Sequence, residues 1–133
     1  MALAVADRFE ILDLAARYNH AVDGGDAAAV AALFVEDGVL DADATGPIRG
    51  RDAIAAYIAS RPDGWQRRRH WNNSPVIEGD GDEATLALYL AVVSWRETIV
   101  PRLVGRYRDE LRRVDGAWRF VRRRIDVDAN PGG

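Results

Sequence analysis

Acid–base chemistry in this chain would rest on two histidines, His20 and His70, together with four tyrosines and 21 acidic residues. A carboxylate bonded to one imidazole nitrogen fixes the tautomer in which the other nitrogen acts as a base. The chain has no cysteine, which excludes thiolate nucleophiles, disulfides and cysteine metal ligands. The two histidines lie in different predicted elements without metal-ligand spacing, and no phosphate-binding glycine loop or Gly-x-Ser-x-Gly elbow is present. We therefore expect neither a metal nor a cofactor.

The composition predicts one soluble domain, residues 1–133, with an ordered core of about 7–127. Its 133 residues are 48% apolar, which suits a single hydrophobic core. No apolar run approaches the roughly 18–20 residues that span a bilayer, and the start lacks the basic region of a signal peptide. We expect a cytoplasmic protein without membrane contact.

Basic residues are grouped at 67–69 and 122–124, but the net charge is −3. Both groups fall in predicted strands, where successive side chains point to opposite faces. Neither group can form one continuous basic patch, so nucleic-acid binding is not expected.

The first half of the chain has helical periodicity. Apolar residues recur at three- and four-residue spacing and predict a helix over 7–22, with the buried face formed by Ile11, Leu14, Ala15, Tyr18 and Val22. Glycines at 24 and 25 end this helix, and Asp26 caps a second one over 27–34. We expect a turn at 36–38, a short extended piece at 39–40, a loop over 41–50 and a third helix over 51–60.

The second half changes to strand periodicity. Strands are predicted at 67–78, 84–97, 103–114 and 117–127, with hairpin turns at 79–82 and 115–116. Pro75 interrupts the first of them, and Pro101 marks a bend before the third. Helices followed by antiparallel strands indicate an α+β fold with helices on one side of a curved sheet.

Three stretches carry a family resemblance: ILDLAARYNHAVDGGD (11–26), LFVEDG (33–38) with IRGRDAIAAY (48–57), and GRYRDELRRVDGAWR (105–119). Together they resemble the SnoaL-like family of the nuclear-transport-factor-two-like superfamily. The resemblance implies a cone-shaped roll, in which a bent, mainly antiparallel sheet wraps around a long N-terminal helix and encloses an apolar pocket. Such curvature requires β-bulges, and Pro75 and Pro101 are plausible positions for them.

The resemblance also implies a site. In the members similar to scytalone dehydratase, bile-acid dehydratase and hexachlorocyclohexane dehydrochlorinase, an Asp after the first long helix works with a His on the first long strand. Asp23 and His70 occupy these places, and Tyr18 matches the aromatic hydroxyl of the bile-acid dehydratases. The expected function is a dehydratase, isomerase or polyketide cyclase-like enzyme that removes a proton from a small hydrophobic oxygenated molecule.

Further residues are candidates for binding that molecule. Alternation in the strand from 103 places Tyr107 and Asp109 on the inward face. Tyr57, on the third helix, and Trp65 are candidate aromatic contacts for a flat apolar ligand. His20 lies roughly 200° around the helix from Tyr18 and is expected to face away from it.

Each catalytic candidate also has a structural interpretation, since Asp23 is typical of a helix-ending turn, His70 of a half-buried strand and Tyr18 of a core. A non-catalytic binding module with the same pocket is therefore a second hypothesis. A third is an assembly subunit like the β subunits of ring-hydroxylating dioxygenases. We expect a homodimer, because the later strands carry more apolar residues than a one-sided sheet needs, among them Leu88, Leu90, Val92, Val93 and Trp95.

Overall fold

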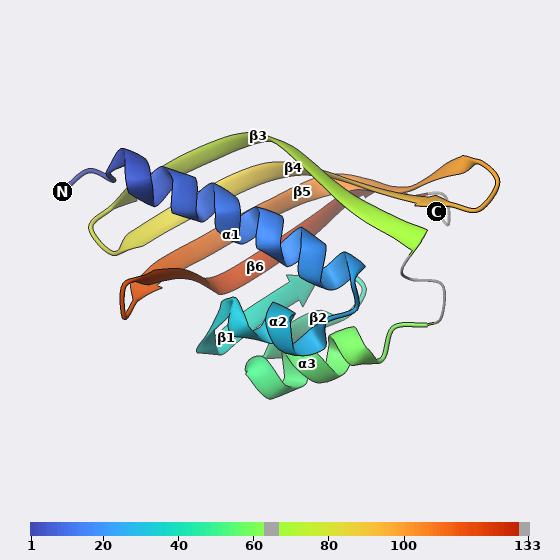
Figure 1. The fold of residues 1–133 in the computed structure, drawn as a ribbon, viewed down its shortest axis with the longest axis horizontal. Helices are drawn as coiled ribbons and strands as arrows, with labels where there is room; N and C mark the ends of the chain where they lie inside the picture. Colours follow the sequence, from blue (N-terminus) through green and yellow to red (C-terminus); the bar gives the residue numbers. More distant parts are fainter. Residues whose placement is uncertain (63–66, 131–133) are drawn as a thin grey trace.

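The computed structural model describes residues 1–62 and 67–130 as an α+β fold (Figure 1). Its helices are α1 (Val5–Asp23), α2 (Ala27–Ala32) and α3 (Arg51–Ala59). Its strands are β1 (Phe34–Ala42), β2 (Gly46–Arg49), β3 (Arg68–Asp80), β4 (Glu83–Trp95), β5 (Ile99–Val114) and β6 (Ala117–Ala129). They form one sheet in the order β2-β1-β6-β5-β4-β3, in which β1 and β6 are parallel and the other pairs antiparallel. The predicted α+β fold is confirmed.

Helix α1 lies across one face of the sheet, which we name the inner face (Figure 1). Its buried residues include Ile11, Leu14, Ala15, Tyr18 and Val22, as the helical periodicity predicted. Within the described ranges 1–62 and 67–130, every helix is too short or too polar to span a bilayer.

The strands place alternate side chains on the inner face. In β4 the buried residues include Leu86, Leu88, Leu90 and Val92, whereas Thr85, Ala87 and Tyr89 between them are exposed. Leucines from this strand, Tyr18 from α1 and Phe120 from β6 belong to one continuous apolar core. Its burial is the main favourable contribution to folding.

Two β-bulges occur at the predicted prolines. The pairing of β3 with β4 shifts register between Asn73 and Val76, with Ser74 at a φ of 54°. The pairing of β4 with β5 shifts beside Pro101, so that Arg102 has no partner in the register. A bulge bends its strand and redirects the side chain at that point.

The region 33–50 differs from the sequence prediction. The second helix ends at Ala32, and Phe34 begins a strand that runs through the expected turn at 36–38. The expected loop 41–50 is a hairpin that contains β2. Strand β1 is stabilised by parallel pairing with the distant β6 and by complete burial of Phe34, and local sequence periodicity does not reveal either contact.

Candidate functional site

The end of α1 positions Asp23. Gly25 has a φ of 70°, a conformation that glycine adopts without strain, and it turns the chain sharply toward α2. The side chain of Asp26 then caps α2 by accepting a hydrogen bond of 3.0 Å from the backbone N–H of Ala29. Because Asp26 supplies this cap, the carboxylate of Asp23 is not needed at the helix junction.

Asp23 instead contacts His70 on β3. Its Oδ1 lies 2.6 Å from the Nδ1 of His70, and its Oδ2 accepts a hydrogen bond of 3.1 Å from the backbone N–H of the same residue. Strand β3 is at the edge of the sheet, and this N–H is directed away from β4. The two side chains are only 10% and 8% exposed, so the contact is shielded from solvent.

A second link joins α1 to β3 beside this pair. Asn19, one helical turn before Asp23, donates from Nδ2 to the Oδ1 of Asn72 at 2.7 Å. Asn72 lies two residues after His70 on the same face and donates to the backbone carbonyl of Tyr89 at 3.3 Å. The two amides therefore fix the end of α1 against the strand that carries His70.

This geometry suits an oriented base. In the neutral imidazole whose Nδ1–H donates to Asp23, the lone pair lies on Nε2, and the carboxylate stabilises the imidazolium that forms after proton transfer. Both residues border a surface hollow of about 570 Å³ between α1 and β3. Its lining comprises Ala16, Asn19, His20, Asp23, Gly24, Arg69 and His70.

Tyr18 lies deeper, on the buried face of α1. Its ring is 1% exposed and meets Phe34, Tyr107 and Phe120 edge-on. Burial raises the pKa of its hydroxyl, although the charge of Arg123 lowers it. The phenol is therefore neutral near pH 7 and able to donate a hydrogen bond.

Arg123 is a buried residue beside Tyr18 that the sequence analysis missed. Its guanidinium is fully buried, with the Cζ 3.5 Å from the ring centre of Tyr107, 4.2 Å from Tyr18 and 4.6 Å from Phe120. Its Nε lies 3.2 Å from the Oδ1 of Asp109, and its Nη atoms make no hydrogen bond to the described residues. The interior thus contains a fixed positive charge in an aromatic surrounding.

Tyr107 and Asp109 lie on the inner face of β5, where strand alternation placed them. Burial raises the pKa of Asp109 to about 7, although the charge of Arg123 lowers it. Burial also raises the pKa of Tyr107 far above its ordinary value. Asp109 consequently exchanges a proton near neutral pH, while Tyr107 remains a neutral phenol.

With this geometry established, comparison with known proteins assigns the family. The family model described as the SnoaL-like domain matches residues 4–124, nearly the whole chain. The chain belongs to the SnoaL-like family. No curated protein matches it.

Solved structures similar to this SnoaL-like protein share its fold. A Nostoc punctiforme protein of unknown function with a cystatin-like fold is 31% identical, with a TM-score of 0.91 and full coverage of both chains. An NTF2-like protein from Novosphingobium aromaticivorans is 32% identical, with a TM-score of 0.87 and coverage of 96% of this chain and 86% of that one. A third structure, from the same organism and named for a proposed scytalone dehydratase activity, is 23% identical at a TM-score of 0.79, with 94% and 86% coverage. That last likeness shows the fold alone.

The remaining candidate residues of the SnoaL-like site are Tyr57 and Trp65. Tyr57 packs against the core from α3, and the guanidinium of Arg61 lies 5.3 Å from its ring centre. The charge of Arg61 also lowers the pKa of the Tyr18 hydroxyl, against the effect of burial. Trp65 lies outside the described residues.

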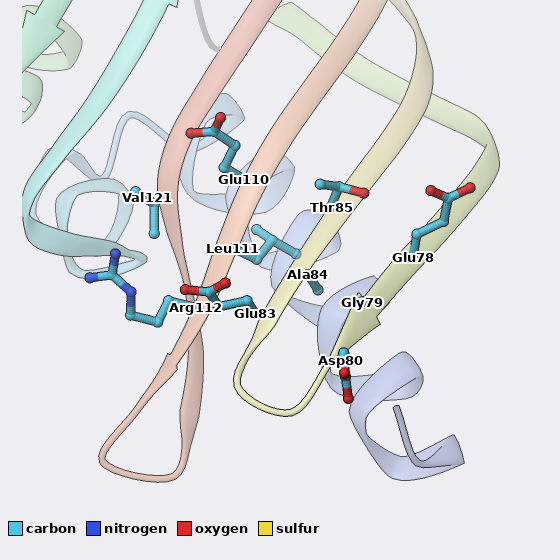
Figure 2. A pocket seen from close by; sticks show the side chains of 10 residues that line it. All are labelled: Glu78, Gly79, Asp80, Glu83, Ala84, Thr85, Glu110, Leu111, Arg112 and Val121. Carbon is cyan, nitrogen blue, oxygen red and sulfur yellow. The ribbon is translucent and has the colours of Figure 1, made fainter. Parts of the chain in front are cut away.

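One other hollow on the SnoaL-like chain differs from this site in its chemistry. A hollow of about 540 Å³ on the opposite, outer face of the sheet is lined by carboxylates of Glu78, Asp80, Glu83 and Glu110 (Figure 2). No described histidine borders it. Across residues 1–62 and 67–130, no three His, Cys, Asp or Glu side chains are grouped so that they could hold a metal ion.

Proposed function

We propose that this SnoaL-like protein is an acid–base enzyme, a dehydratase, isomerase or cyclase, in which His70 removes a proton from carbon and Asp23 orients it. The observation that carries the proposal is the contact of 2.6 Å between His70 Nδ1 and Asp23 Oδ1, made by two side chains shielded from solvent. Membership of a family that includes enzymes adds support.

The first step is the same for each reaction. His70 Nε2 takes a proton from a carbon next to a carbonyl; the C–H electron pair forms a C=C bond, and the carbonyl π pair moves onto the oxygen to form an enolate. The enolate then expels a β-hydroxide, takes a proton at another carbon, or attacks a second carbonyl. Dehydration, isomerisation or cyclisation follows, respectively, and none of these steps requires a cofactor.

Interior groups suit the negative charge of the enolate. The neutral phenol of Tyr18 is a hydrogen-bond donor, and the buried charge of Arg123 lies 4.2 Å from its ring centre. A fixed positive charge in a low-dielectric interior favours negative charge more strongly than the same group in water. We assign both residues to stabilisation of the developing oxyanion.

Deuterium incorporation tests this function without knowledge of the true substrate. In D₂O, an enzyme that removes a carbon-bound proton exchanges it for deuterium whatever reaction follows. We expect the protein to accelerate exchange in at least one of a panel of aromatic β-hydroxy ketones and bicyclic ketones such as 2-tetralone, monitored by proton NMR. Binding of these ketones without any exchange would contradict the proposal and support the binding-module hypothesis.

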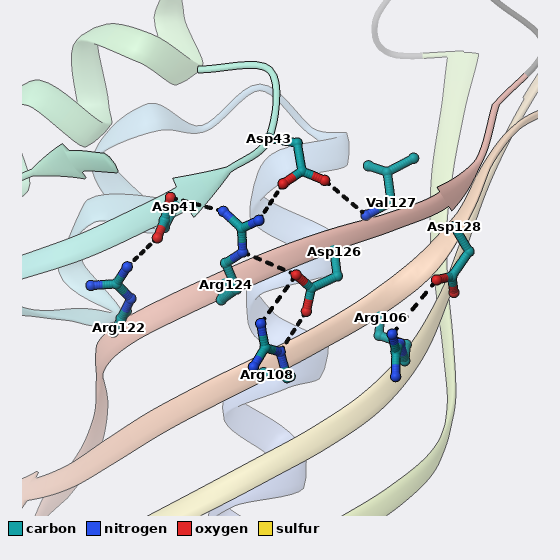
Figure 3. Close-up of polar contacts among 9 residues, drawn as sticks. All are labelled: Asp41, Asp43, Arg106, Arg108, Arg122, Arg124, Asp126, Val127 and Asp128. Carbon is teal, nitrogen blue, oxygen red and sulfur yellow. Dashed lines mark hydrogen bonds and ion pairs between the residues drawn. The ribbon is translucent and has the colours of Figure 1, made fainter. Parts of the chain in front are cut away.

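We also propose a homodimer formed through part of the outer sheet face. The strands β1, β6 and β5 carry a network of ion pairs there, from Asp41 and Asp43 to Asp126 and Asp128 (Figure 3). Toward β3 the same face instead presents exposed apolar side chains of Trp71, Val76, Tyr89 and Val104. Leu88, Leu90 and Val92, which suggested the dimer from the sequence, face inward and do not contribute.

A further inference from the structure

The inner face carries a row of polar residues directly beside the row that contains His70. In the sheet register, His70 pairs with Val92, and Val92 pairs with Leu103. Two residues along the same strands, Arg68 pairs with Ser94. Because side chains at i and i+2 share a face, Arg68 and Ser94 lie one step from His70, at about 6–7 Å along the strand.

The bulge in β5 adds a second guanidinium to this row. Arg102 is the unpaired residue of the bulge, and its Nε donates a hydrogen bond of 2.7 Å to the Oγ of Ser94. Ser94 is 8% exposed, whereas Arg102 is exposed to solvent. The row therefore begins at the surface and leads inward toward His70.

The charges in this row act on one another. Burial lowers the pKa of the Arg68 guanidinium, and the positive charges of Arg102 and Arg61 lower it further. Arg68 on β3 and Arg102 on β5 thus bring two guanidinium groups to the same end of the inner face, on either side of Ser94. A negative charge placed between them is favoured by both.

We propose that the row Arg68–Ser94–Arg102 binds a carboxylate of the substrate, with the reacting carbon one row away at His70. The placement of the reacting carbon rests on the function proposed above, while recognition of the carboxylate does not. Guanidinium groups and a hydroxyl match the hydrogen-bonding geometry of a carboxylate, and the bond from Arg102 to Ser94 holds one guanidinium in place. The substrate class is accordingly an apolar carboxylic acid whose acidic carbon and carboxylate reach two neighbouring rows of the sheet.

Binding of matched probes tests this inference. 2-Naphthoate has an apolar body of suitable length, and 2-naphthamide has the same shape without the charge. We expect the wild-type protein to bind 2-naphthoate about tenfold more tightly than 2-naphthamide in calorimetric or NMR titrations, and to lose this preference in Arg102→Gln. Arg102→Lys should restore part of it, and affinity for the anion should fall as NaCl is raised.

Arg106→Gln is the control, because Arg106 lies on the same strand, is exposed on the outer face and, among the described residues, forms only a 3.7 Å ion pair with Asp128. It should leave the preference for 2-naphthoate intact. Equal binding of the two probes by wild type, no detectable binding of 2-naphthoate, or an equal loss in Arg102→Gln and Arg106→Gln would each overturn the inference. Binding of 2-naphthyl phosphate more than tenfold tighter than 2-naphthoate would overturn the choice of a carboxylate.

These experiments distinguish a failure of this inference from a failure of the proposed acid–base function. His70→Ala should still bind 2-naphthoate in a manner that depends on Arg102, because neither guanidinium needs the imidazole. A protein that binds the anion through Arg102 but exchanges no carbon-bound proton retains this inference and loses the acid–base function. A protein that exchanges protons but does not distinguish the two probes loses the inference alone.

Discussion

Arg123 and Asp109 meet inside the protein, with Nε and Oδ1 3.2 Å apart and neither side chain exposed. Removal of Arg123 and removal of Asp109 have different consequences for the partner that remains buried. Asp109, whose pKa burial already raises to about 7, becomes neutral by taking a proton, whereas a guanidinium keeps its charge. Asp109→Leu should therefore cost about 3–5 kcal/mol of the free energy of unfolding. Arg123→Met should cost less at pH 6 than at pH 8, as measured by urea unfolding.

The double variant Asp109→Leu/Arg123→Met is the control for this pair, because it leaves no buried charge. Its free energy of unfolding should lie closer to wild type than that of Asp109→Leu alone. A double variant as unstable as the sum of the two single variants would contradict the assignment of a coupled buried pair.

Stability at low pH should depend on Asp7. Its carboxylate accepts hydrogen bonds from the indole of Trp118, at 3.0 Å, from Arg113 and from the backbone N–H of Ala4. These bonds lower the pKa of Asp7, and the bond from Trp118 is the largest cause. A pKa that is lower in the folded state stabilises the protein above about pH 4, and this contribution is lost as pH falls through the folded value. Asp7→Asn should thus destabilise the protein at pH 7 and progressively less toward pH 3.

Thermal unfolding across this pH range measures the effect. Asp13→Asn provides the matched control, since Asp13 is an exposed residue of the same helix that pairs with Arg17 one turn away. It should change stability little at any pH, as is usual for exposed pairs. A deficit in Asp7→Asn that stays constant from pH 7 to pH 3 would contradict the linkage.

The sequence was sufficient to predict the fold class, most helix and strand positions, and the residues at the junction of α1 and β3. The fold class and the element positions rest on local signals, such as the stripe that includes Ile11 and Val22, whereas the pairing of Asp23 with His70 was implied by the family resemblance. Most of strand β1, beyond the extended piece expected at 39–40, was missed because its stability comes from pairing with β6, about 80 residues away in the chain. Local periodicity contains no information on such a partner.

Local sequence periodicity also could not predict that Arg123 is buried. From Trp118 and Phe120, which are buried, strict alternation would put Arg122 and Arg124 inside. The pairing with β5 shifts at this point, between Glu110 and Leu111, and places Arg123 inside instead. An arginine triplet within an apolar strand was the available signal that one member is buried, but the sequence does not identify which.

Substitution on the outer sheet face tests the dimer. Tyr89 is 59% exposed and lies between Trp71 and Val76 on this surface. Tyr89→Glu places a charge in the proposed interface and should yield a monomer of 14.7 kDa in sedimentation at micromolar concentration, where wild type is a dimer. Arg112→Glu, on the same face near the β5–β6 hairpin and away from these apolar residues, should remain dimeric. A monomeric wild-type protein would contradict the proposal.

Tyr18→Phe should slow deuterium exchange by about tenfold or less, because it removes one neutral hydrogen bond to the developing oxyanion. The phenyl ring retains the edge-on contacts with Phe34 and Phe120, so the melting temperature should change little. Initial exchange rates at saturating ketone separate this effect from one on binding. An unchanged rate would remove Tyr18 from the mechanism.

The rate of deuterium exchange in dyad variants tests the account most directly. On the ketone that exchanges fastest with wild type, His70→Ala should lower the initial rate by about 10²–10⁴-fold, because the carbon-bound proton has no acceptor. Asp23→Asn should also lower it severely, because an amide favours the wrong imidazole tautomer, whereas Asp13→Asn should match wild type. Circular dichroism should show all three variants folded. Folded His70→Ala protein that exchanges protons at the wild-type rate would contradict the assignment of His70 as the base.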